Sequence, residues 1–179
     1  MRDLYKYSEE CIDEMKSMGV EVSNLPNIIW TVSSRAKSRY GQCYMRSKSK
    51  CVIDISKFLL DESITPNEDA LKNTIIHELL HALYPNDGHK GRWKNMADHI
   101  TKASNGKYII KRCTSYQEKG IDIEKLIVQH PKRSMPKYNI KCTNCGASYL
   151  RIKRTKIVKR PDLYKCGVCN GDLKVIELA

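Results

Sequence analysis

The chain has 179 residues, enough for one modest domain and a small additional module. No apolar run approaches the ~20 residues of a membrane-spanning helix, which excludes an integral membrane protein of that kind. The formal net charge is +12 and is unevenly placed, because residues 106–179 carry 17 Lys/Arg against 6 Asp/Glu while residues 1–105 are close to neutral. This second part has the electrostatic character of a protein that binds a polyanion.

The first predicted elements are one amphipathic helix and three short strands. Apolar residues at helical spacing predict a helix over residues 3–18, closed by Gly19. Alternating apolar residues predict strands over 27–33, 42–46 and 51–55. The N-terminus leads into a polar amphipathic helix and not into a secretory signal, so we expect a cytoplasmic protein, nucleoid-associated or nuclear according to the host.

A basic segment connects these strands. No acidic residue occurs from Ser33 to Lys50, while Arg35, Arg39 and Arg46 contribute positive charge. Two interpretations stay open. The segment extends a nucleic-acid track toward the following helix, or its basic residues protect an exposed sheet edge.

A buried helix is predicted over residues 66–84. Thr65 is the expected N-cap, Pro66 suits the first helical position, and Glu68 completes a capping box. Pro85 ends the helix, because proline disfavours helical geometry in the residue before it. Apolar residues occupy most sides of this helix, which is typical of a buried one.

This helix carries an H-E-x-x-H motif at residues 77–81. His77 and His81 are one turn apart on one face, so their imidazoles can converge on one Zn²⁺. Glu78 is turned by ~100° and suits a general base that acts on water. The alternative is two hydrogen-bonded structural histidines and a surface glutamate.

A catalytic zinc of this type needs a third protein ligand and an open position. The Pro85–Gly88 turn folds a second predicted helix, residues 88–104, back against the first. His89 is expected on the apolar stripe of that helix, four residues before Trp93. We therefore favour His89 as the third ligand over Asp98 and His99, which point away from the stripe.

Two cysteine pairs form the second constellation. They follow a short predicted helix over 121–129 and a linker over 130–136. The motif C-x-x-C occurs twice, with twenty residues between the pairs, and its cysteines are Cys142, Cys145, Cys166 and Cys169. This is close to the spacing of a structural Cys₄ zinc site. Two disulfides are the alternative, and a cytosolic setting favours the metal. The other four cysteines are expected to be reduced thiols.

The densest basic run lies between the cysteine pairs, where a zinc ribbon would have a hairpin. Its cationic residues are Arg151, Lys153, Arg154, Lys156, Lys159 and Arg160. Tyr138, Tyr149 and Tyr164 lie in the same module and are candidates to stack on unpaired bases. The alternative is a solvated basic hairpin whose tyrosines fill a thin core.

The segment 77–82, followed by Gly88-His89-x-x-x-Trp93, resembles the SprT-like metalloprotease family, which includes the Spartan DNA–protein crosslink proteases. Segments 40–44 and 52–56 are similar to the short strands that precede the family's active-site helix, and the paired cysteines to the zinc ribbon of many members. The resemblance implies a zinc endopeptidase that acts on proteins bound or crosslinked to DNA.

The expected architecture is therefore α+β: a zincin-like metalloprotease domain over residues 1–135, then a β zinc ribbon over 136–179. We expect one catalytic and one structural zinc, and DNA bound without sequence preference. Two other functions stay open: a nucleic-acid-binding regulatory zinc protein without protease activity, and a dedicated regulatory protease that does not need DNA.

Overall fold

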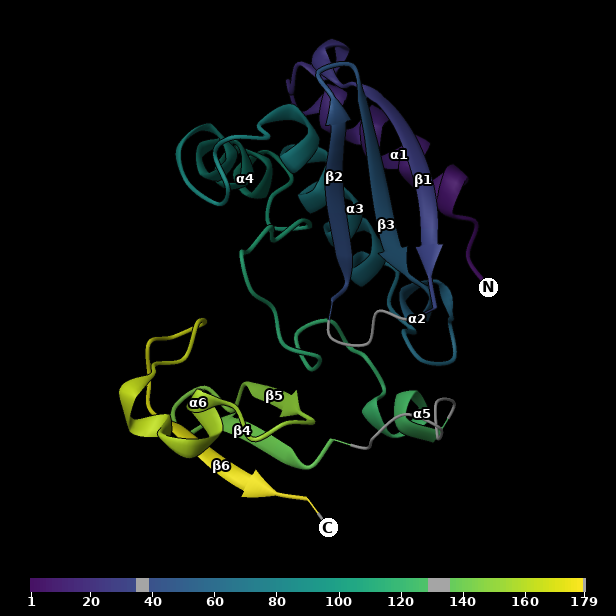
Figure 1. The fold of residues 1–179 in the computed structure, drawn as a ribbon. Coiled ribbons are helices and arrows are strands. Elements are labelled where there is room, and N and C mark those ends of the chain that lie inside the picture. Colours follow the sequence, from purple (N-terminus) through teal and green to yellow (C-terminus); the bar gives the residue numbers. More distant parts are fainter. Residues whose placement is uncertain (35–38, 129–135, 179) are drawn as a thin grey trace. The chain divides into compact units, whose positions relative to one another are not determined.

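The computed structural model describes residues 1–34, 39–128 and 136–178 (Figure 1). The chain divides into two compact units, Met1–Arg112 and Cys113–Ala179. This division falls earlier than the expected domain boundary at 135/136, because residues 113–128 belong to the same unit as the cysteine pairs. Nearly all of the expected linker 130–136 lies outside the described residues.

The first unit combines helices with one small sheet. In chain order its elements are α1 (Leu4–Ser17), η1 (Val22–Asn24), β1 (Asn27–Ser33), β2 (Gly41–Ser47), β3 (Lys50–Ser56), α2 (Lys57–Leu60), α3 (Asp69–Leu83) and α4 (Gly91–Ala103). The predicted helix 3–18 and the three predicted strands are confirmed to within one residue at each end. The four-residue helix α2 was not predicted.

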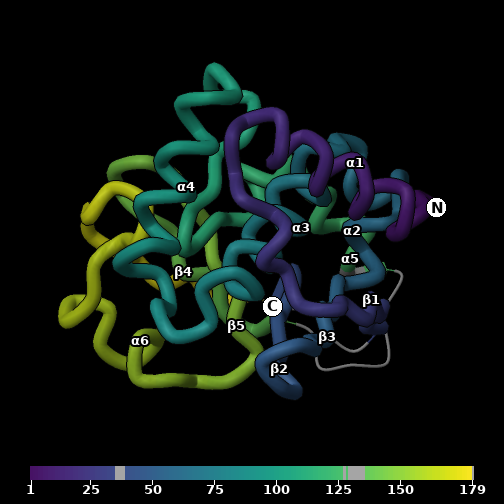
Figure 2. The backbone as a smooth tube through the Cα atoms, turned by 90° about the horizontal axis from the view of Figure 1, so that it is seen from above, coloured from purple at the N-terminus to yellow at the C-terminus, as the bar shows by residue number. Residues whose placement is uncertain are grey.

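The sheet of this unit has the order β1-β3-β2, with β1 parallel and β2 antiparallel to β3. Every second side chain of β3 is fully buried: Cys51, Ile53 and Ile55. Helices α1 and α3 lie on one side of the strands, as both views show (Figures 1 and 2), and α3 contacts β2 and β3. The central strand β3 therefore supplies buried side chains to the core, and β2 is an edge strand beside α3.

Helix α3 begins at Asp69, three residues later than predicted. The predicted cap at Thr65 is wrong, because its buried hydroxyl donates to the Phe58 carbonyl oxygen at 2.8 Å. The side chain of Asn67 instead accepts a hydrogen bond from the backbone N–H of Asp69. The C-terminal end is as predicted: α3 ends at Leu83, just before Pro85.

Helix α4 begins at Gly91, so the prediction of a helix from residue 88 is also wrong at its start. The Asp87 carboxylate accepts from the backbone N–H of Arg92 at 2.8 Å. Gly88 and Gly91 both have positive φ, which the helix interior does not allow. The apolar stripe of α4 is confirmed by the burial of Trp93, Ala97 and Ile100.

A buried lysine joins α1 to α3. The Lys72 ammonium lies 3.0 Å from Glu10, 3.3 Å from Glu14 and 3.7 Å from Glu68. Glu14 also accepts from the Tyr108 hydroxyl and from Lys107. Burial alone would lower the pKa of Lys72, but its hydrogen bonds to Glu10 and Glu14 and their charges raise it above its ordinary value. The ammonium is the charge that holds these carboxylates together.

Replacing this lysine with methionine should destabilise the first unit. Lys72→Met leaves three carboxylates facing one another without their central cation, and we expect the free energy of unfolding to fall by about 1–3 kcal/mol. The loss is smaller than at a fully buried pair, because the carboxylate side chains are 30–50% exposed. Urea unfolding measures it. Lys16→Met, on the exposed side of α1, is the control and should lower the free energy of unfolding by only a few tenths of a kcal/mol.

The same cluster should make the unit sensitive to acid. Burial alone would raise the pKa of Glu14, but hydrogen bonds from Tyr108 and Lys107 and the charge of Lys72 lower it. A depressed pKa means that the unfolded chain binds protons more readily. The stabilisation is therefore fully present above the ordinary carboxyl pKa of 4.5 and is lost as the pH falls below it. Urea unfolding at pH 7 and pH 3 should show a shallower fall in Lys72→Met. An equal fall in both proteins would contradict this role.

The second unit is built around a small antiparallel sheet. Its elements are α5 (Ile123–Val128), β4 (Tyr138–Cys142), β5 (Ser148–Arg151), α6 (Lys156–Lys159), η2 (Pro161–Leu163) and β6 (Leu173–Glu177). The strand order is β5-β4-β6. The predicted basic hairpin is wrong: the run 151–160 forms the end of β5 and the short helix α6, because Val158 turns inward and is buried.

One apolar cluster of this unit is built on the paired cysteines. Its buried members are Cys142, Ala147 and Cys166, and half-buried side chains such as Tyr149 pack around them. Ile140 of β4 and Val158 of α6 are buried as well. Among the described residues of either unit, none of the helices combines the length and apolarity needed to cross a membrane.

Candidate metal centres and active site

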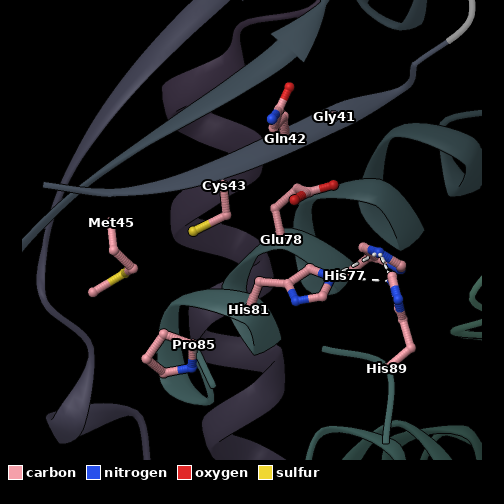
Figure 3. Close-up of a pocket in the computed structure, with 9 residues that line it drawn as sticks. All are labelled: Gly41, Gln42, Cys43, Met45, His77, Glu78, His81, Pro85 and His89. Carbon is pink, nitrogen blue, oxygen red and sulfur yellow. Dashed lines mark hydrogen bonds between the residues drawn. The ribbon is translucent and has the colours of Figure 1, made fainter. Parts of the chain in front are cut away.

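Three histidines of the first unit converge on one point. The Nε2 atoms of His77 and His81 are 3.2 Å apart, and each lies 3.1 Å from Nε2 of His89 (Figure 3). His77 and His81 come from successive turns of α3, whereas His89 lies in the turn before α4. The structure brings His89 together with His77 and His81. The reason given for His89 was wrong, since it lies in a turn and not on a helical stripe.

The donor set fits a metal ion. An imidazole nitrogen either donates or accepts one hydrogen bond, so three mutual contacts cannot all be hydrogen bonds. Nitrogens about 2.0–2.1 Å from a tetrahedral zinc are separated by about 3.3 Å, close to the distances found here. Burial lowers the pKa of His81 to about 4, and burial followed by the charge of Arg112 lowers that of His89. Both rings are therefore neutral near pH 7, which is the form that binds zinc.

The rejected candidates lie elsewhere. His99 is exposed, and its Nε2 donates to the backbone oxygen of Met18 at 2.7 Å, so this side chain serves the end of α1. Asp98 is exposed on α4. Within the described ranges, the three-histidine group and the four-cysteine group are the clusters of three or more potential ligands.

Trp93 packs against all three imidazoles. Its ring is stacked on His81, with centroids 5.3 Å apart, and meets His77 and His89 edge-on at 4.9 and 4.7 Å. The indole is 2% exposed. Among the described residues its Nε1 has no hydrogen-bond partner, so its role here is packing. Trp93 restricts the rotation of the rings and keeps their nitrogens directed at one point.

Glu78 and residues of β2 complete a pocket of about 280 Å³. The lining residues are Gly41, Gln42, Cys43, Met45, His77, Glu78, His81, Pro85 and His89 (Figure 3). Glu78 is only 5% exposed, so its carboxylate faces the pocket and not bulk solvent. Burial, together with the nearby Cys51 and Glu78, raises the pKa of Cys43 to about 12, which keeps that thiol neutral.

No residue of β2 was among the site residues predicted from the sequence. Gly41, Cys43 and Met45 pair with Ile55, Ile53 and Cys51, and cross-strand partners share one face of a sheet. The alternation of β2 was visible in the sequence, but alternation alone does not say which strand lies beside α3.

The four cysteines of the second unit also converge. The Sγ atoms of Cys142 and Cys169 are 3.5 Å apart, and those of Cys145 and Cys166 are 3.7 Å apart. Sulfurs about 2.3 Å from a tetrahedral zinc are about 3.8 Å apart, so this group fits the ion as well. All eight cysteines of the chain are free, as the zinc interpretation expects.

Backbone N–H groups surround these sulfurs. Asn144 and Cys145 direct theirs at Cys142, and Val168 directs its own at Cys166. Burial alone would raise the pKa of Cys166, but N–H groups from Cys169 and Val168 lower it to about 6. A side chain at Gly171 would come within 3.2 Å of two sulfurs, so the second knuckle needs glycine there. Four sulfur ligands complete a tetrahedral set and leave no open position.

The basic residues of the run 151–160 are exposed, except for the half-buried Arg151. Arg160 is paired with Asp162 at 2.8 Å, which reduces its availability to a ligand. Of the three tyrosines, Tyr149 belongs to the metal site, with its hydroxyl 3.6 Å from Cys166 Sγ. Tyr164 is 38% exposed and is the best placed of the three for stacking.

The fold is mixed α+β, and its two clusters, three histidines and four cysteines, are candidate metal sites compatible with zinc. The family model of the SprT-like family matches residues 7–118, more than half of the chain. The chain therefore belongs to the SprT-like family, which is associated with zinc metallopeptidases. The match includes the three histidines and Glu78 but ends before the four cysteines. No curated protein matches the chain.

Proposed function

We propose that this protein is a zinc-dependent endopeptidase. One observation carries the proposal: three imidazole nitrogens converge within 3.2 Å of one another in the same pocket as a buried glutamate. Structural histidines would not direct three ring nitrogens at one another. A purely structural metal would not need a pocket beside it.

The residues have distinct roles in this proposal. His77, His81 and His89 hold the zinc, which when bound supplies Lewis acidity toward the scissile carbonyl. Glu78 takes a proton from the attacking water and passes it to the leaving amine. Trp93 keeps the three imidazoles oriented. Cys142, Cys145, Cys166 and Cys169 hold a second, structural zinc that maintains the fold of the other unit.

A peptide substrate suits the wall of this pocket. β2 is an edge strand of its sheet, and four of its first five residues line the pocket. Unpaired backbone groups of an edge strand accept an extended peptide by strand addition. Such a peptide would run alongside Glu78 and the three histidines, which supports cleavage within a chain.

Nucleic acid is the proposed partner. The charge excess of residues 106–179 and the exposed lysines and arginine around α6 support it. The substrates would be proteins bound or crosslinked to DNA, as the family resemblance implies. Under this proposal the basic unit recruits DNA, and cleavage is restricted to proteins on the same DNA.

The test uses zinc-replete protein and a basic DNA-binding protein as substrate, with and without DNA. Cleavage that increases with DNA supports the proposal. DNA-independent cleavage would favour a dedicated regulatory protease instead. DNA binding without cleavage of any protein, in a preparation that holds both zincs, would favour a regulatory nucleic-acid-binding protein.

Charge reversal tests the DNA partner. The variant replaces four cations with glutamate: Arg151, Lys153, Arg154 and Lys156. We expect weaker DNA binding. The slope of log affinity against log salt concentration should become shallower by about one unit for each phosphate contact that is lost. Zinc content and cleavage of an unstructured peptide should be unchanged, because these residues lie outside both metal clusters.

The matched control reverses four exposed lysines of the first unit: Lys16, Lys57, Lys94 and Lys102. Its net charge equals that of the first variant, so a general charge effect would weaken both alike. If the α6 variant binds DNA as tightly as wild type at moderate salt, the basic run is only a solvated face.

A further inference from the structure

The backbone of β2 lies directly against the side chain of Glu78. A Cβ atom added to Gly41 would lie 2.8 Å from both Cγ and Oε1 of Glu78, and 3.0 Å from Cγ2 of Thr74. Contacts this short are not tolerated, so something would have to move. The Cγ contact matters most, because it involves the stem of Glu78 and not only its mobile carboxylate.

The need for glycine here comes from space and not from backbone conformation. Gly41 pairs with Ile55 in the β2–β3 ladder and is not among the residues with positive φ. Alanine is therefore compatible with the backbone at this position. A glycine in a strand commonly marks a close approach by another group. At Gly41, the first residue of β2, that group is the glutamate of the pocket.

We propose that Gly41 is a positioning residue: the bare main chain of β2 at this point is the wall that holds Glu78 beside the three histidines. The inference rests on the proposed function, since it assigns a catalytic use to the position of Glu78. The three atoms nearest to the added Cβ belong to Glu78 and Thr74 and not to a histidine, so we expect a change at Gly41 to displace the base without removing a metal ligand.

The first test is Gly41→Ala, measured with an unstructured peptide. We expect kcat to fall by ~10²-fold, the scale of a misplaced catalytic group, with a much smaller change in KM. Both zincs should be retained. Gly106→Ala is the control, because Gly106 has a φ of 80° and nothing within 4 Å of the added atom. It should lower stability through backbone strain and leave kcat unchanged.

A second variant separates Glu78 from Thr74. Gly41→Ala/Thr74→Ser removes the threonine methyl group from the crowded space and keeps its hydroxyl, which donates to the Ala70 carbonyl oxygen. The loss of kcat should persist in this double variant. Recovery to the wild-type kcat would show that packing of α3 against β2, and not the glutamate, is responsible.

The third measurement does not depend on activity. It compares the fall in Tm caused by Gly41→Ala in two zinc-free proteins, one with Glu78 and one carrying Glu78→Ala, in which the crowded stem is absent. The fall should be larger by ~4 °C or more when Glu78 is present. Equal shifts in both backgrounds would overturn the inference, as would a normal kcat in Gly41→Ala. An inactive wild type would contradict the proposed function. The difference between the two Tm shifts would still show whether Gly41 holds Glu78 in place.

Discussion

Glu78→Gln is expected to lower the rate of peptide cleavage by ~10²-fold or more. Glutamine has the same shape as glutamate, so its stem occupies the same space against Gly41 and the pocket keeps its form. The amide cannot take a proton from water near neutral pH. Substrate binding, zinc binding and DNA binding do not use that proton, so only kcat should change.

The measurement combines kcat and KM on a peptide with elemental analysis of zinc. The variant should hold as much zinc as wild type and melt at a similar temperature. Cleavage at the wild-type rate in a preparation free of other proteases would show that Glu78 is not the base. Loss of zinc would mean that the variant had altered the three-histidine site and could not be interpreted as a change of base.

The second large effect concerns the two metal sites. Loss of metal from one site should have a different effect on folding than loss of metal from the other. The three-histidine site lies in a unit whose core includes fully buried Ile53, Leu71 and Leu79, and this core does not depend on the metal. In the second unit, by contrast, the ligands Cys142 and Cys166 are themselves buried members of an apolar cluster. Removing metal should therefore leave the first unit folded and unfold the sheet of the second.

We expect two zinc ions per chain, of which a chelator removes the one at the histidines first. The apparent free energy of a structural zinc is about 10–16 kcal/mol, because its binding is coupled to folding. His77→Ala should reduce the content to one zinc with the second unit intact. Cys142→Ser should lose the other zinc and the ordered signals of β4, β5 and β6 in NMR spectra.

Cys113→Ser is the control for the cysteine variant, because Cys113 is exposed and lies outside both clusters. It should keep both zincs. A wild type with one zinc, unchanged by His77→Ala, would remove the catalytic proposal. A second unit that stays ordered without zinc would show that its other buried side chains are sufficient to hold the fold.

Features that depend on neighbouring residues were predictable from the sequence. The spacing of His77 and His81 places them one turn apart on any helix, and the C-x-x-C pairs likewise need only a local turn to direct two sulfurs together. The strands 27–33 and 51–55 followed from alternation, and the end of α3 from Pro85. In each case the covalent chain itself limits the geometry.

Capping and turn details were predicted less well. Thr65 has the right side chain for a helix cap, but its hydroxyl donates to Phe58 instead. The Asp87 side chain accepts a hydrogen bond from the backbone N–H of Arg92, so α4 begins later than predicted and His89 lies in a turn. Each of these polar groups had several partners within reach, and the packing of the surrounding chain decided between them.

Tertiary structure alone decided which distant segments share the pocket. Glu78 meets Gly41 across 37 positions of sequence, Lys72 gathers carboxylates from α1, and Tyr149 turns to Cys166 and not to solvent. No local pattern records these pairings, because they depend on the register of β2 and on the side of the sheet that α3 covers. The sequence determined which chemical groups the protein has and their local spacing, whereas packing determined which of them meet.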